Sequence, residues 1–503
     1  MTPITRVLVA NRGEIALRII RACHEEGLQA VAVYSAADRT SPHVRAADLA
    51  LAIGPAPAGE SYLRIDRILE AARVSGAQAI HPGYGFLAER APFADAVAEA
   101  GLAFVGPPPS AIRAMGDKTE ARRRMRAAGV PVVPGADRPL DLAGARDLAE
   151  EIGYPVMVKA VAGGGGKGMR VVHQAGDLES ALGTAAREAQ KSFGDPAVYV
   201  EKFIDRPRHV EIQVLADATR TIHLGERECS VQRRHQKLLE EAPSIAVGAD
   251  LRDRMGRAAV AAAEAVGYRG AGTCEFLLAA DGSFYFLEMN TRIQVEHPVT
   301  ELVYGVDLVR EQLRIVRGMP MSIPDEPRQP NGWSVECRIT GEDPANGFLP
   351  VTGRIEYLRV PSGPGVRWDA GVETGDEVTL HYDSMIAKLI VWARDRTEAL
   401  DRMERALGEL IVAGLSTNQG FHRRLIRDPA FRAGEVDIQF LDRRQDLLTP
   451  ADDGAMERVV AVAAALAEDE ARRNRKPAIA PTATAGRWVE AGRRAGLREG
   501  GER

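Results

Sequence analysis

The sequence has few cysteines, no excess of either charge and no long hydrophobic run, and each shortage excludes a class of protein. Its four cysteines lie far apart and form no CxxC pair. This spacing excludes a disulfide scaffold or a zinc ribbon and suits a reducing compartment. No window approaches the roughly 18 apolar residues of a membrane span, and the apolar stretch at the N-terminus is too short for a signal peptide. We therefore expect a cytoplasmic protein with no membrane partner.

Size and charge set further limits. The 65 lysines and arginines nearly balance the 70 acidic residues, giving a net charge of −5. This balance does not indicate nucleic acid as a partner. The hydrophobic fraction of 45% and the charged fraction of 27% are typical of a globular protein. A chain of 503 residues predicts roughly three domains.

Strand and helix signals alternate at the start of the chain. Residues 7–10 and 30–34 are short apolar runs, and residues 14–26 between them have the apolar spacing of a helix. This alternation predicts a mostly parallel sheet covered on both faces. Later segments are mixed, with expected helices near 251–267, 305–317 and 397–411 and expected strands near 209–215, 271–278, 284–296, 334–340 and 388–393.

A glycine-rich loop separates two expected strands, residues 154–160 and 169–172. Residues 163–168 hold five glycines and one lysine. Glycine lets backbone N–H groups approach phosphate oxygens. No Ser or Thr follows Lys167 and a strand follows the loop, which excludes a P-loop and a dinucleotide fingerprint. The pattern predicts a hairpin that closes over a triphosphate, or else a mobile surface loop.

The dipeptide Asp281-Gly282 is typical of a two-residue hairpin turn. Such a turn makes Glu275 and Glu288 direct cross-strand partners, and opposed carboxylates repel unless a positive group lies between them. Oxygen ligands suit Mg²⁺ or Mn²⁺, and Asn290 on the same face adds an amide oxygen. The pattern predicts a metal site; the alternative is an exposed hairpin with scattered acids.

Polar residues continue at alternate positions beyond this hairpin, to Glu296. If the strand stays extended, they share one face. Arg292 and Gln294 would then orient a small planar anion, and Glu296 would act on it as a base. A solvated edge strand would show the same alternation. Taken alone, Lys118, Lys159 and Arg338 are ambiguous.

Several long motifs occur together in one order, and with them the chain resembles biotin carboxylase over about residues 4–445. The motifs are ANRGEIA (10–16), HPGYGFL (81–87), MGDK (115–118), the glycine loop, QRRHQK (232–237), residues 288–298 and YDSM (382–385). The resemblance implies an ATP-grasp fold, of class α/β and α+β. It also implies an N-terminal parallel α/β domain, a mobile glycine-loop lid and a C-terminal mixed domain.

The resemblance also implies roles for individual residues. Glu275, Glu288 and Asn290 would hold the metal ions, Glu296 would deprotonate bicarbonate, and Arg338 would stabilise the biotin enolate. Bicarbonate would bind to Lys237, Arg292, Gln294 and Val295. ATP would contact Lys118, Lys159, Gly165, Gly166, Glu201, Lys202, Ile204, His209 and His235.

The expected domains are residues 1–115 (N-terminal α/β), 116–133 (linker helix), 134–204 (lid), 205–446 (C-terminal region) and 447–503 (helical and basic tail). The tail carries an apolar stripe from Met456 to Leu466, which is typical of a linker or docking element. The chain contains no Met-Lys-Met biotinylation motif.

The resemblance therefore implies a homodimer, a separate biotin carboxyl carrier protein and a separate carboxyltransferase. The carboxyl acceptor stays open between acetyl-CoA, propionyl-CoA, pyruvate and others. Two alternatives remain: another ATP-grasp ligase with a different acceptor, and a non-catalytic nucleotide-sensing scaffold.

Overall fold

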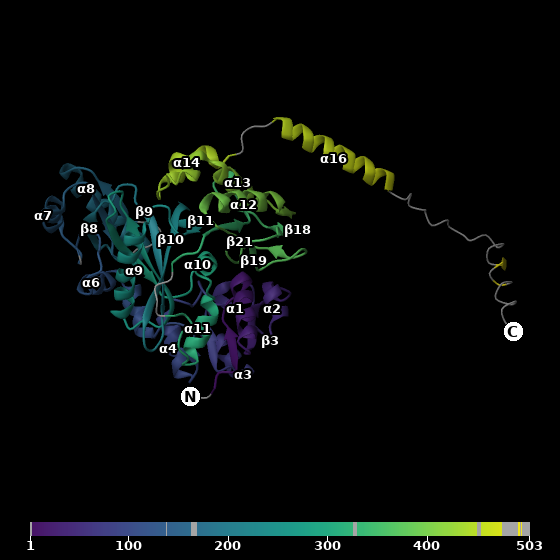
Figure 1. Cartoon of the computed structure of the whole chain (residues 1–503), viewed down its shortest axis with the longest axis horizontal. Coiled ribbons are helices and arrows are strands. Elements are labelled where there is room, and N and C mark those ends of the chain that lie inside the picture. The colour runs from purple at the N-terminus through teal and green to yellow at the C-terminus, as the bar shows by residue number, and fades with distance from the viewer. Residues whose placement is uncertain are drawn as a thin grey trace. The chain divides into compact units, whose positions relative to one another are not determined.

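The computed structural model describes residues 3–136, 138–161, 168–324, 329–449, 454–474, 491–492 and 494. The chain divides into two compact units, Met1–Thr449 and Pro450–Arg503. Three sheets with their helices form most of the larger unit (Figure 1).

The first sheet is parallel, with strand order β3-β2-β1-β4-β5. Val7 and Val9 of β1 pack in one hydrophobic cluster and Leu8 packs in another, so the sheet is covered on both faces, as the sequence predicted. Its elements are β1 (Arg6–Val9), α1 (Gly13–Glu25), β2 (Gln29–Ser35), α2 (Pro42–Ala46), β3 (Leu49–Gly54), α3 (Ile65–Ser75), β4 (Ala79–His81), α4 (Ala91–Glu99) and β5 (Ala103–Phe104).

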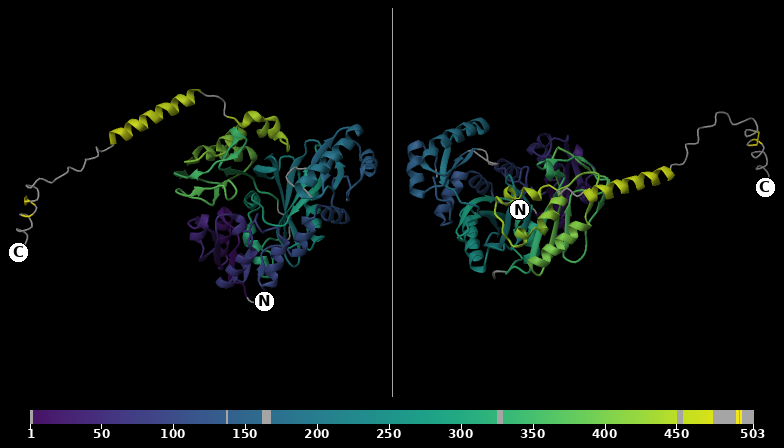
Figure 2. Two further views of the ribbon diagram at one scale, coloured as in Figure 1. Left: turned by 180° about the vertical axis from the view of Figure 1, so that it is seen from behind. Right: turned by 90° about the horizontal axis from the view of Figure 1, so that it is seen from above.

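The second sheet is small and antiparallel, with strand order β7-β6-β8. The helices α7 (Leu142–Ile152) and α8 (Leu178–Phe193) contribute to its core, and Figure 2 shows this blue group beside the teal strands of the largest sheet. The pairing of β6 (Val156–Ala160) with β7 (Met169–Val172) confirms the predicted hairpin, and β8 is Val198–Lys202. Residues 162–167 of the glycine loop lie outside the described residues.

The third sheet is antiparallel and has eight strands in the order β13-β12-β9-β10-β11-β14-β21-β19. Helix α9 packs on β9 and β10, while α12 and α13 share a core with β14 and β21. The elements are β9 (Arg208–Ala216), β10 (Thr221–Arg233), β11 (Gln236–Ala242), α9 (Ala249–Glu264), β12 (Gly270–Leu278), β13 (Phe284–Asn290), α10 (His297–Tyr304), α11 (Leu308–Val316), β14 (Trp333–Thr340), β19 (Val366–Ala370), β21 (Met385–Ala393), α12 (Arg396–Glu409) and α13 (Gln419–Arg427).

Three of these strands, β10, β11 and β19, were not among the expected elements. Of these, β10 and β11 carry buried ionic side chains, such as Glu226, Arg227 and Glu240, which interrupt the apolar alternation that marks a strand. The shorter elements are α5 (Pro109–Gly116), α6 (Lys118–Ala127), β15 (Glu342–Asp343), β16 (Leu349–Pro350), β17 (Gly353–Arg354), β18 (Tyr357–Arg359), β20 (Glu377–Val378), β22 (Ile411–Ala413), α14 (Pro429–Arg432) and α15 (Phe440–Arg443).

One strand prediction was wrong at its end. The strand expected over residues 284–296 stops at Asn290, and Glu296 is already the N-cap of α10. The intervening residues form bends and a turn because Pro298 at the start of α10 suits the first turn of a helix and not a continuing strand.

The smaller unit contains α16 (Gly454–Asn474), a helix that the sequence predicted. Its Val462 and Leu466 are 60% and 65% exposed. No helix among the described residues of either unit combines the length and apolarity needed to span a membrane.

Candidate functional site

The β12–β13 hairpin places Glu275 directly opposite Glu288, as predicted. The connection is nevertheless one residue longer than a two-residue turn, because the Ala279 N–H donates to the Ser283 carbonyl. A bulge corrects the register, since Phe276 pairs with Phe286 and Leu287 is left as the extra residue. Two deviations from regular geometry therefore cancel, and the acidic pair forms.

The two opposed carboxylates have different surroundings. Glu275 is buried and lies 2.9 Å from Lys237 Nζ and 3.0 Å from His209 Nε2. Burial disfavours its charge, but Lys237 and His209 outweigh burial and hold the pKa of Glu275 well below its usual range. Glu288 is exposed, and desolvation together with the charge of Glu275 raises its pKa. Because an exposed carboxylate keeps most of its hydration, the repulsion from Glu275 is the main cause.

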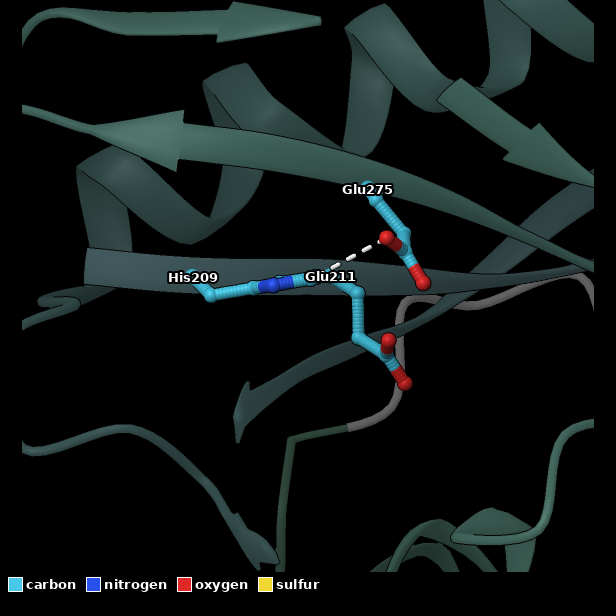
Figure 3. A group of neighbouring side chains, drawn as sticks. All are labelled: His209, Glu211 and Glu275. Carbon is cyan, nitrogen blue, oxygen red and sulfur yellow. Dashed lines mark ion pairs between the residues drawn. The ribbon is translucent and has the colours of Figure 1, made fainter. Parts of the chain in front are cut away.

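Lys237 and His209 thus hold one member of the pair, Glu275. The divalent ion expected at the pair stays a prediction. Figure 3 shows the dashed ion pair from His209 to Glu275, with Glu211 beside them. Ligand atoms of these three residues lie within 4.8 Å of one another.

Lys237 is the centre of a cluster of buried carboxylates. Its Nζ lies 2.6 Å from Glu211, 2.9 Å from Glu275 and 2.7 Å from Glu296. Burial alone would lower the pKa of Lys237, but these carboxylates raise it well above its usual value. The cluster therefore fixes the cationic side chain of Lys237 among three carboxylates. Sequence reasoning missed Glu211, although its position two residues after His209 on one strand face was a usable signal.

Arg227 is a second residue that the sequence reasoning missed. It is fully buried and donates to Glu211, Gln213, Thr273 and Thr300. Its guanidinium shares the charge of Glu211 with Lys237, so Glu211 is held from two sides.

The residues after β13 return to Glu275 through a turn. Arg292 lies 2.7 Å from Glu89 and donates to Asn290 Oδ1 and Gln294 Oε1 at 3.0 and 2.9 Å. Asn290 Nδ2 in turn donates to Glu275 at 2.9 Å. Asn290, Arg292 and Gln294 therefore lie together beside Glu275, as predicted. The extended strand that was expected to align them ends at Asn290.

Glu296 and Arg338 meet at the other end of the cluster. Glu296 is fully buried and accepts from Lys237 at 2.7 Å and from Arg338 at 2.9 Å. Burial opposes its charge, yet Lys237 and Arg338 hold the pKa of Glu296 well below its usual value. The Val295 carbonyl accepts from Lys388 Nζ at 2.8 Å. The side chain of Arg338 therefore belongs to the same cluster of charged groups as Lys237.

A second group gathers on the small sheet. Lys159 of β6 forms an ion pair with Glu201 of β8, and Arg122 lies 3.1 Å from the same carboxylate. Lys202 donates to the Gly153 carbonyl at 2.9 Å, and Ile204 is half-buried just beyond β8. Within the described ranges, no hydrogen bond or ion pair joins this group to the Lys237 cluster.

The remaining expected nucleotide contacts lie elsewhere. Lys118 begins α6, and its positive charge acts on Glu288. His235 forms the β10–β11 turn with a φ of 66°. Gly165 and Gly166 lie outside the described residues.

The large sheet with its acidic hairpin, joined to a small hairpin-bearing sheet, defines an ATP-grasp enzyme. Residues 117–323 match the family model for the ATP-binding domain of the carbamoyl-phosphate synthase L chain. Residues 3–112 match the N-terminal domain of biotin carboxylase, and residues 336–443 match its C-terminal domain.

Relatives over nearly the whole length agree. The biotin carboxylase of Nostoc sp. is 52% identical over 438 residues, covering 87% of this chain and 98% of the relative. The biotin carboxylase of Haemophilus influenzae is 51% identical over 442 residues, also covering 87% and 98%. The biotin carboxylase domain of 2-oxoglutarate carboxylase from Hydrogenobacter thermophilus superimposes with a TM-score of 0.84 at 46% identity, covering 90% of this chain and all of that one. The chain belongs to the biotin carboxylase family, whose members are ATP-dependent ligases.

Proposed function

We propose that this site carboxylates biotin on a carrier protein, using ATP and bicarbonate and passing through carboxyphosphate. The observation that carries the proposal is the shared contact of Glu296 with Lys237 and Arg338, which joins an anion-binding group to an arginine at hydrogen-bond distance. The Hydrogenobacter domain was solved as a dimer with MgADP, ADP and bicarbonate. Those ligands match the chemistry of the residues gathered here.

The metal ligands in this proposal are Glu275, Glu288 and Asn290. The directly opposed carboxylates and the neighbouring amide offer only oxygen to a hard cation, so the donor set fits Mg²⁺ or Mn²⁺. When bound, this cation offsets the negative charge of the ATP phosphates. Glu288 has the accessible carboxylate, so it is the member whose loss we expect to weaken binding most.

Nucleotide binding is assigned to the group on the small sheet together with Lys118, His209 and His235. Lys118 and Lys159 act as point charges on phosphate oxygens, and Glu201, Lys202 and Ile204 form the edge beside the adenine. Burial disfavours protonation of His209, but Glu275 outweighs burial and raises the pKa of His209, which favours the protonated ring that would face phosphate. The assignment also includes Gly165, Gly166 and His235.

Bicarbonate is assigned to Lys237, Arg292, Gln294 and the backbone of Val295. Glu296 is ionised in the resting site and can accept the bicarbonate proton. An anion that takes one N–H of Lys237 away from Glu296 leaves that carboxylate more basic. The deprotonated oxygen of bicarbonate then attacks the γ-phosphorus of ATP. The bond between that phosphorus and the bridging oxygen breaks, and the oxygen leaves with ADP.

Biotin is assigned to the Arg338 end of the site. Carboxyphosphate breaks down to CO₂ and phosphate, and the phosphate takes the ureido proton of biotin. The guanidinium of Arg338 stabilises the enolate oxygen that develops, a task suited to a fixed, permanently charged donor. The nitrogen of the enolate then attacks CO₂.

The domain division predicted from the sequence stands as part of the proposal, with residues 134–204 as a lid that keeps water from carboxyphosphate. Relatives named as a methylcrotonoyl-CoA carboxylase and a pyruvate carboxylase show that family members work within larger carboxylases. We propose a homodimer served by a biotin carboxyl carrier protein and a carboxyltransferase. The four cysteines are unpaired and buried, which agrees with a cytoplasmic location.

Phosphate release from ATP tests the proposal. We expect release that depends on bicarbonate and Mg²⁺ and rises when biotin is added. Release with bicarbonate but no response to biotin or its carrier would favour another ATP-grasp ligase. No release under any of these conditions would favour a nucleotide-sensing scaffold.

A further inference from the structure

A second pair of glutamates faces each other in the large sheet. Glu240 of β11 is the direct antiparallel partner of Glu336 of β14. Direct partners bring their Cβ atoms to about 5 Å. Both side chains are 0% exposed. The pair therefore holds two carboxyl groups side by side without access to water.

Only one of the four oxygens of this pair has a partner among the described residues. Arg338 Nε donates to Glu240 Oε1 at 2.7 Å. Glu240 Oε2 and both oxygens of Glu336 make no hydrogen bond to the described protein atoms. A buried carboxylate without a partner is far more costly than a protonated carboxyl group in the same place.

The charges that face Glu336 come from four elements. Lys388 of β21 and Arg338 of β14 are positive, whereas Glu240 of β11 and Glu296 at the start of α10 are negative. Lys388 already donates to the Val295 carbonyl and lies 3.2 Å from Glu14. His297 of α10 is kept uncharged, because burial and nearby cations lower its pKa well below the usual value. Lys388 and Arg338 thus contact other groups, and neither forms a hydrogen bond with Glu336 among the described residues.

We propose that Glu240 and Glu336 hold one proton between them, and that Glu336 is a positioning residue that acts through Glu240 on Arg338. With one proton the pair carries a single negative charge, which orients the Arg338 fork. With no proton the pair would carry two negative charges. These charges would bind Arg338 more strongly and would oppose the negative charge that develops on the biotin enolate. The inference rests on the proposed role of Arg338.

The titration of the pair supports this geometry. Burial raises the pKa of Glu240 to about 7, against the opposing effect of Arg338. Burial also raises the pKa of Glu336 well above its usual value. Two such neighbours cannot both ionise in a buried site, so the proton belongs to the pair. None of these groups is a proposed metal ligand.

The matched substitutions are Glu336→Gln and Glu241→Gln. Glutamine copies a protonated carboxyl group in shape and charge but cannot ionise. Glu241 follows Glu240 on β11 and is buried on the opposite face of that strand, where Arg396 and Trp333 donate hydrogen bonds to it. We expect Glu336→Gln to keep kcat/KM for biotin within about twofold at neutral pH and to move the alkaline loss of activity upward by about one pH unit. Glu241→Gln should leave that pH profile in place.

Infrared spectroscopy tests the proton directly in the wild-type protein and does not depend on any variant folding. We expect a protonated-carboxyl C=O band in protein with labelled glutamate above neutral pH, unchanged in Glu241→Gln and weaker in Glu336→Gln, since burial also raises the pKa of Glu14 and Glu228. Absence of the band from wild type would overturn the shared proton. The band with an unchanged pH profile in Glu336→Gln would overturn the positioning role. If Arg338→Ala left biotin carboxylation intact, the proposed function would fail separately.

Discussion

Two pairs of opposed glutamates lie in one sheet, and their access to solvent differs. Glu275 and Glu288 sit at the hairpin edge, where Lys237 and His209 hold one member and the other is exposed. Glu240 and Glu336 lie between central strands, fully buried, with one arginine contacting one member.

The comparison teaches that register alone does not decide what a carboxylate pair binds. An accessible pair can admit a hydrated divalent ion, whereas a sealed pair can admit only a proton. We therefore propose that the same cross-strand arrangement serves as a metal site at one place and holds a shared proton at another.

The largest effect is expected at the accessible pair. Glu288→Gln removes one charge from the metal site and should lower bicarbonate-dependent ATP cleavage by more than about 100-fold. Phosphate release at saturating Mg²⁺ measures this loss. Asp281→Asn, in the exposed turn of the same hairpin, is the control and should retain activity. Normal turnover in Glu288→Gln would remove the metal-site assignment.

The next effect is expected at Arg338, which contacts Glu240 of the buried pair and is the proposed biotin-binding residue. Arg338→Ala should lower kcat/KM for biotin by about 100-fold, the size typical of losing a donor to a developing oxyanion. The KM for ATP should stay within about twofold, because the ion pairs of Arg338 within the described chain go to Glu240 and Glu296. Steady-state kinetics with each substrate varied in turn separate the two. Equal losses in both would contradict the assigned role.

A smaller effect concerns stability and pH. A raised carboxyl pKa means that the native protein keeps a proton that the unfolded chain loses, so stability falls as pH rises. The loss should be about 1.4 kcal/mol per pH unit per proton, between the unfolded glutamate pKa near 4.3 and the folded value. Burial sets that folded value at about 7 for Glu240. Comparing the thermal unfolding of wild type and Glu336→Gln across this range measures it; parallel curves would contradict the shared proton.

The smallest effect should come from removing the tail. Residues 450–503 form a separate compact unit, and the family models end at residue 443. Deleting residues 450–503 should leave carboxylation of free biotin within about twofold, since both glutamate pairs lie in the larger unit. Loss of co-purifying subunits from the shortened protein would assign the tail to docking. A large loss of carboxylation would show that the site is not contained in the larger unit.

The sequence was informative where local signals set the geometry. The turn dipeptide predicted the pairing of Glu275 with Glu288, and it succeeded because the bulge at Leu287 offsets the longer turn. The glycine loop was correctly placed between paired strands. Neither the bulge nor the turn length has a clear local signal.

The rest depended on contacts between distant segments. Glu211, Arg227 and Glu240 are buried ionic residues, which periodicity assigns to the surface. Their strands satisfy these charges pairwise only once the sheet has formed. The straight path to Glu296 was wrong for a similar reason, because the start of α10 turns the chain back toward Lys237.

The most direct test of the account is Mn²⁺ binding, followed by electron paramagnetic resonance in the presence of a non-hydrolysable ATP analogue. Wild type should bind the ion and Glu288→Gln should bind it at least about tenfold more weakly, while Glu336→Gln should match wild type. Equal Mn²⁺ affinity in wild type and Glu288→Gln would contradict the claim that the accessible pair holds the metal.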